Sequence, residues 1–142
     1  MSTPQKFAMG YFGFLTMVGL LNYLPIPGLV DANGLVCGIF ALDIFDDLLH
    51  FASAGLALLT ALWSERAARL YLTLFGAAYL ADGLLGMATG VGYLDLGIFR
   101  WGVQPFDLMF RIFSNGPHIF AGALALWAGI RSGRGPSAPA AA

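Results

Sequence analysis

The chain has 142 residues, of which 58% are hydrophobic and only 11% are charged, with a formal net charge of −1. An ordinary soluble domain has roughly 25% charged residues, and a chain this short buries only part of its surface when it folds. The composition therefore argues against a soluble globule and predicts a surface that faces lipid. Because Lys and Arg are not in excess, it also argues against a nucleic-acid-binding protein.

The single cysteine, Cys37, rules out a disulfide within the chain and a cysteine-based zinc site. The sequence has no recognisable nucleophile elbow or nucleotide-binding loop, which favours a non-enzymatic protein. Residues 132–142 are rich in Gly, Pro and Ala, a composition that forms no core. We therefore expect a single domain over residues 1–131, followed by a disordered tail.

The first apolar stretch covers residues 7–24, carries no charge and ends at Pro25-Ile-Pro-Gly28. This pattern is typical of a transmembrane helix with a sharp stop. A cleaved signal peptide is the alternative, because Lys6 precedes the apolar run and Val30-Asp-Ala32 resembles a cleavage site. The residues alone leave open whether the first span is cleaved.

Three further spans follow along the chain. A second is predicted over residues 44–63, with acidic residues at its N-terminal end, where the helix dipole favours negative charge. A third is predicted over 70–91, in which Asp82 is the only acidic or basic residue, and a fourth over 112–130, ending at Arg131. The predicted fold class is therefore all-α and integral to the membrane, as a four-helix transmembrane bundle.

Basic residues predict the orientation of this bundle. They flank the start of the first span, the connection between the second and third, and the end of the fourth, as Lys6, Arg66, Arg69, Arg131 and Arg134. The connection over 25–47 has neither Lys nor Arg. By the positive-inside rule both termini are cytoplasmic, as in a bacterial inner-membrane protein, although Arg100 and Arg111 weigh against this orientation.

The two halves of the sequence resemble each other. A shift of 68 residues aligns His50 with His118, and it also aligns Phe7 with Phe75, Tyr11 with Tyr79, and Arg66 with Arg134. We therefore expect two parallel helical-hairpin repeats, over about residues 6–66 and 74–134. Chance similarity is the alternative, because apolar spans use few residue types.

Polar residues in these spans are predicted to form one layer. In the second span Asp43, Asp47 and His50 lie on one helical face, with Asp46 beside them. A helix rises about 1.5 Å per residue. By this measure His50, Asp82 and His118 all lie at the same depth from the cytoplasmic ends of their spans. The expected layer contains Asn22, Asp43, Asp46, Asp47, His50, Asp82, Asn115 and His118.

This layer has several interpretations. It can be a hydrogen-bonded network that fixes the register of the bundle. It can bind a divalent metal through Asp47, His50, Asp82 and His118, or a haem through the two histidines. It can relay protons or ions through Asp82 and the histidines, although the cytoplasmic half offers few polar groups. Finally, the bundle can be an accessory subunit of a membrane complex or of a homo-oligomer, because its many small residues suit partner helices.

Short motifs suggest a family. Asp47-Leu-Leu-His50, Asn115-Gly-Pro-His118 and Leu74-Phe-Gly-Ala-Ala-Tyr79 resemble segments of the domain of unknown function 4383 family, which consists of uncharacterised bacterial four-helix membrane proteins. The resemblance covers about residues 7–131. In that family Asn is usual where this chain has Asp47, and Pro117 before the second histidine is a further departure. The resemblance implies the four-helix membrane fold and no particular activity.

Overall fold

The computed structural model describes residues 1–40 and 42–132, and every regular element in them is helical. The predicted all-helical fold class is thus confirmed. The elements are α1 (Thr3–Leu20), the 3-10 helix η1 (Leu21–Tyr23), α2 (Ile44–Trp63), α3 (Glu65–Thr89), α4 (Gly97–Trp101) and α5 (Leu108–Arg131). The short helix α4 is not predicted from the sequence. Apart from Ser132, the predicted tail over 132–142 lies outside the described residues.

Side-chain caps set the helix boundaries. Asp43 accepts hydrogen bonds from two backbone N–H groups in the first turn of α2, and Asp107 does the same for one such group in α5. Ser64 is both the C-cap of α2 and the N-cap of α3, so the chain reverses over a single residue. At the far end of α3, Gly90 adopts a left-handed conformation with φ of 92°. These caps satisfy backbone groups that the helix ends leave without partners.

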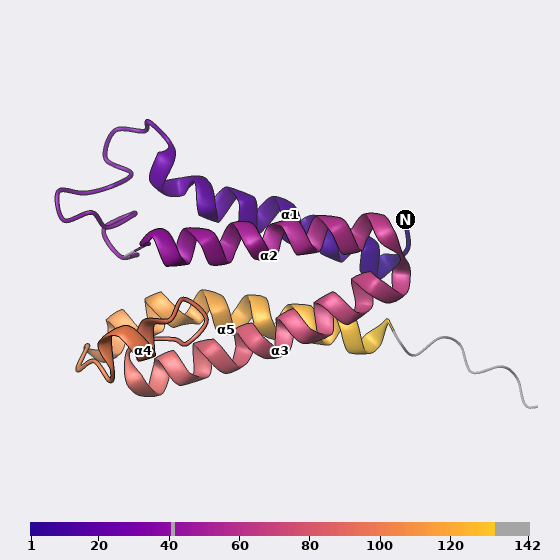
Figure 1. Cartoon of the computed structure of the whole chain (residues 1–142). Coiled ribbons are helices and arrows are strands. Elements are labelled where there is room, and N and C mark those ends of the chain that lie inside the picture. The colour runs from indigo at the N-terminus through magenta and orange to yellow at the C-terminus, as the bar shows by residue number, and fades with distance from the viewer. Residues whose placement is uncertain (41, 133–142) are drawn as a thin grey trace, which may run out of the picture.

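The four long helices run up, down, up and down, and form two pairs (Figure 1). Helix α1 packs mainly on α2, and α3 mainly on α5. We call these pairs the α1–α2 hairpin and the α3–α5 hairpin. The connections over 24–43 and 90–107 lie together at one end, which we call the loop end (Figure 1). The N-terminus and the turn at Ser64 lie at the opposite end, the turn end.

Glycines bring the backbones of the α3–α5 hairpin into contact. A Cβ atom added at Gly76 would collide with the backbone of Leu126, and one added at Gly122 would collide with the backbone of Leu80. At Gly129 a Cβ atom would lie 2.8 Å from the backbone nitrogen of Thr73. Small residues at these positions are what allows two helices to approach so closely.

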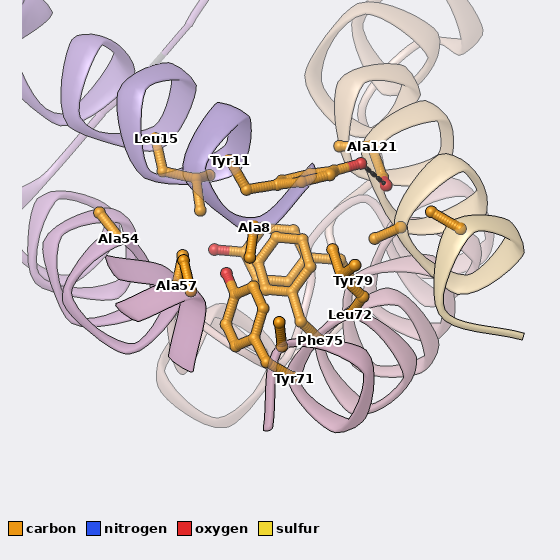
Figure 2. Packing of buried hydrophobic residues seen from close by; sticks show 14 residues of the cluster. Ala8, Tyr11, Leu15, Ala54, Ala57, Tyr71, Leu72, Phe75, Tyr79 and Ala121 are labelled. Atoms are coloured by element: carbon orange, nitrogen blue, oxygen red, sulfur yellow. Dashed lines mark hydrogen bonds between the residues drawn. The ribbon is translucent and has the colours of Figure 1, made fainter. Parts of the chain in front are cut away.

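The core between the hairpins is a cluster of aromatic residues with alanines packed around it. Tyr11 of α1 and Tyr71, Phe75 and Tyr79 of α3 are buried against one another, surrounded by small residues of α2 and α5 (Figure 2). The Tyr11 hydroxyl donates a hydrogen bond of 2.6 Å to the Ala121 carbonyl in α5. This bond links the first hairpin to the second.

The outward faces of the helices are apolar. In α2, Leu59 and Leu62 are more than 60% exposed, and Leu74 in α3 is equally exposed. Helices α2 and α3 are long and apolar enough to cross a membrane, and among the described residues only these two meet that criterion. Helix α1 includes the polar start Thr3-Pro-Gln-Lys6, and α5 includes Ser114-Asn-Gly-Pro-His118, which lower their apolarity.

Candidate functional site

Asp82 is a deeply buried carboxylate near the loop end of α3, with 2% of the residue exposed. Its Oδ1 atom accepts hydrogen bonds from the backbone N–H groups of Tyr93, at 2.6 Å, and Leu94, at 2.8 Å. A Cβ atom added at Gly92 would lie 2.5 Å from the same oxygen, so glycine is required for the loop to approach. Asp82 therefore fastens the 90–107 connection to α3.

The other oxygen of Asp82 binds His118. The distance from Oδ2 to His118 Nδ1 is 2.6 Å, and the contact joins α3 to α5. An ionised carboxylate only accepts hydrogen bonds, and three donors around Asp82 stabilise that ionised form. We therefore assign the His118 proton to Nδ1, which leaves a lone pair on Nε2.

His50 lies next to His118 but comes from the other hairpin. The two ring centroids are 6.2 Å apart and the ring planes meet at 65°. His50 Nδ1 lies 2.7 Å from the Asp46 carbonyl oxygen, which can only accept, so Nδ1 carries the proton here too. In the described part of the chain neither Nε2 atom makes a hydrogen bond, and neither is fully shielded from solvent.

Hydroxyl groups extend from this histidine pair into the core. The rings of His118 and Tyr79 have centroids 5.0 Å apart, and the Tyr79 hydroxyl lies 3.3 Å from Ser53 Oγ. Tyr71 donates to the Ser53 carbonyl at 3.0 Å. The sequence predicts few polar groups in this half of the bundle, and these tyrosines of α3 are not among the polar residues predicted from it. The alignment of Tyr79 with Tyr11 was the available signal.

Asp47 and Asn22 form a separate cluster within the α1–α2 hairpin. Both carboxylate oxygens of Asp47 lie 3.2 Å from Asn22 Nδ2, and one accepts a 2.8 Å hydrogen bond from the Tyr23 hydroxyl. Asn22 also donates to the Leu42 carbonyl at 2.9 Å. These bonds close the 24–43 connection over the end of the hairpin.

Asp43 and Asp46 cap α2. The Asp43 backbone N–H donates to the Asp46 carboxylate at 3.1 Å, and the Asp43 carboxylate forms a 2.6 Å ion pair with Arg100. The Arg100 guanidinium also lies 4.1 Å from the centroid of the Phe45 ring. Burial alone would raise the pKa of Asp43, but the bonds from Arg100 and from backbone N–H groups outweigh it and hold the pKa below its usual value.

Asn115 lies where α3 and α5 touch. It donates from Nδ2 to the Arg111 carbonyl at 2.9 Å, and its Oδ1 fills the space where a Cβ atom at Gly86 would be. The Arg111 guanidinium donates to the carbonyls of Ala88 and Gln104, at 2.9 and 3.1 Å. Arg111 thus ties the end of α3 to the 90–107 connection.

The structure therefore divides the predicted polar layer into parts. It brings His50, Asp82 and His118 together, whereas Asp47 is engaged with Asn22. The four predicted metal ligands are not assembled as one ligand set. Over residues 1–40 and 42–132, no group of three or more His, Cys, Asp or Glu residues is arranged to hold a metal ion. The unengaged ligand atoms are the two imidazole Nε2 atoms.

Comparison with known proteins gives no match: no protein-family model, no curated protein and no solved structure is similar to this chain. The likeness to the domain of unknown function 4383 family therefore rests on the short motifs alone.

Proposed function

We propose that this chain is an integral membrane protein, a four-helix bundle in which all four long helices span a bacterial inner membrane. The charge distribution supports it. Apart from Glu65, every acidic residue lies in the loop-end half, and apart from Arg100 and Arg111, every described basic residue lies at the turn end. The start of α1 and the end of α5 both lie at the turn end. By the positive-inside rule this end is cytoplasmic.

The proposal includes the two helical-hairpin repeats, and the pattern of buried residues supports them. Positions separated by 68 residues are buried together in the two hairpins, namely Tyr11 and Tyr79, Leu15 and Gly83, Asp47 and Asn115, Ala54 and Gly122, Ala57 and Ala125, and Ala61 and Gly129. Equivalent helices thus turn the same face inward. This is the relation expected of two copies of one hairpin about an axis along the membrane normal.

A labelling experiment tests the membrane proposal. Cys37 is exposed in the 24–43 connection at the loop end. In spheroplasts with an intact inner membrane, a membrane-impermeant maleimide should label Cys37. Extraction of the membranes with alkaline carbonate should leave the chain in the membrane pellet. In a Cys37→Ser background, Ser132→Cys should react only after lysis. Release by carbonate would contradict the membrane proposal, and the reverse labelling pattern would contradict the orientation.

We further propose that His50 and His118 bind a transition metal ion through their Nε2 atoms. One observation carries this proposal: both rings are held at Nδ1 and lie beside each other, which leaves the Nε2 atom of each ring without a hydrogen bond. Histidine ligands of metals almost always donate their other N–H to a carboxylate or a backbone carbonyl. Here the carboxylate is that of Asp82 and the carbonyl is that of Asp46.

The ring separation is compatible with a shared ion. Metal–nitrogen bonds of about 2.0–2.1 Å allow the centroids of two rings to be at most about 6.4 Å apart across one ion. The observed 6.2 Å falls within that limit and implies a wide angle between the two nitrogens. Copper is the favoured ion, because the affinity of nitrogen ligands peaks at Cu²⁺ in the first-row series.

Elemental analysis tests the metal site. Detergent-purified protein is loaded with Cu²⁺ or Zn²⁺ and dialysed, and we expect a single retained ion per chain. His50→Ala and His118→Ala should each lose it, and Asp82→Asn should weaken binding about 10–100-fold. Asp47→Asn, in the separate cluster, is the matched control and should bind normally.

Two outcomes would contradict the metal proposal. One is a wild-type protein that retains no ion after loading. The other is equal retention by wild type and both histidine variants, with circular dichroism confirming that the variants are folded. An absorption spectrum of the same samples reports on haem, which requires the same two histidines as axial ligands.

A further inference from the structure

An apolar groove runs between α1 and α5, along the seam of the two hairpins. It has a volume of about 510 Å³ and is lined by Phe7, Gly10 and Phe14 from α1 and by Phe120 and Leu124 from α5. Sites for small ligands typically enclose about 300–1,000 Å³. Lys6 lines the groove at its turn end. The groove is thus large enough for a ligand and has a cation at one end.

A second hollow continues the seam at the turn end. It has a volume of about 540 Å³, shares Phe7 with the groove, and is lined by polar residues that include Ser2, Glu65 and Arg131. The ring of Trp127 meets Phe7 edge-on, with centroids 6.3 Å apart. The seam therefore passes from an apolar middle to a polar end.

We infer that this seam binds an anionic phospholipid of the surrounding bilayer, with an acyl chain in the groove and the phosphate at the turn end. The inference depends on the membrane proposal and is independent of the metal site. Lys6 and Arg131 outweigh Glu65 in charge there. The cytoplasmic leaflet, which the turn end faces in the proposed orientation, is rich in anionic lipid.

The contacts of the chain itself leave the groove open. Helices α1 and α5 touch each other far less than either touches its hairpin partner. A Cβ atom added at Gly10 would meet nothing within 4 Å, so internal packing does not require a glycine there. The guanidinium of Arg131 lies 5.4 Å from the centroid of the Trp127 ring, which holds this cation beside the polar hollow.

Native mass spectrometry of the detergent-solubilised full chain tests the inference, with an equal mixture of phosphatidylglycerol and phosphatidylcholine as the probe. We expect retained phosphatidylglycerol, and about fivefold weaker retention in Lys6→Gln, since a basic residue near anionic lipid contributes about that factor. Arg69→Gln removes an exposed basic residue of the turn end that does not line the seam and should retain lipid normally. Gly10→Leu should expel the lipid by filling the groove.

Gly55→Leu is the control for bulk, because a Cβ atom at Gly55 in α2 likewise meets nothing within 4 Å. Equal retention of the two lipids would overturn the inference, as would equal retention by Gly10→Leu and Gly55→Leu. A stable dimer that only Gly10→Leu dissociates would assign the groove to a second copy of the chain instead. Failure of the membrane proposal can be told apart from failure of this inference. In the first case alkaline carbonate would release the chain from the membrane, whatever lipid it retains.

Discussion

The two hairpins have different residues at buried positions that are 68 residues apart in the sequence. Where the α1–α2 hairpin has Ala8, Ala54 and Ala61, the α3–α5 hairpin has glycine 68 residues later in each case. The glycines let α3 and α5 touch through their backbones, whereas α1 and α2 meet through side-chain methyl groups. Alanine at these positions thus accompanies side-chain packing in one hairpin, and glycine accompanies backbone contact in the other.

The same comparison explains where the buried charge lies. Asp82 in α3 comes 68 residues after Phe14 in α1, and Phe14 is exposed beside the groove. In the described part of the chain, the 90–107 connection places two backbone N–H groups on Asp82, well inside α3. A buried carboxylate is tolerated when such donors surround it, so Asp82 occurs in one hairpin and not in the other.

Removing this carboxylate should have the largest effect. Asp82→Ala leaves the Nδ1–H of His118 and two backbone N–H groups without their acceptor, and each buried donor left unsatisfied costs about 1–3 kcal/mol. Thermal unfolding in detergent, followed by circular dichroism, measures it. Asp47→Ala is the control in the other hairpin, where the donors Asn22 and Tyr23 are partly exposed and can bind water. Equal losses in the two variants would remove the distinction between the hairpins.

A single methyl group should have the next largest effect. Gly122→Ala places a Cβ atom against the backbone of Leu80 and should cost about 1–3 kcal/mol through overpacking. Gly55→Ala adds the same methyl group to α2, where nothing lies within 4 Å. That control should be neutral or up to about 1 kcal/mol stabilising, because alanine is the better helix former. An equal decrease of the unfolding midpoint in the two variants would contradict the proposed backbone contact.

Much of the fold follows from local sequence signals. Helix α2 has the bounds predicted for the second span, because Asp43 and Ser64 are strong caps at its two ends. Counting residues placed His50, Asp82 and His118 at one level, and the structure brings these three side chains together. Such inferences work because helix geometry converts spacing directly into depth.

The partners of these residues do not follow from spacing. Asp82 binds the backbone of Tyr93 and Leu94 in an irregular connection, and no periodic pattern describes such a segment. Asp47 and Asn115 align when the sequence is shifted by 68 residues, yet Asp47 binds Asn22 and Asn115 binds its own helix. Which neighbour a polar group finds depends on how closely the helices approach, which the alanine and glycine differences determine.

The smallest predicted effect concerns Arg100, which joins the hairpins at the loop end. Its partner Asp43 has a lowered pKa, so the ion pair should stabilise the fold above about pH 4, the unfolded value, and lose this effect as pH falls further. Because both side chains are partly exposed, Arg100→Gln should cost less than about 1 kcal/mol at pH 7. Unfolding of both proteins between pH 7 and 3 should show this cost shrinking with acidification. A residual cost at pH 3 would measure the contact with Phe45, which does not titrate. If the difference in stability between wild type and Arg100→Gln stayed constant from pH 7 to 3, the whole effect of Arg100 would be assigned to its contact with the Phe45 ring.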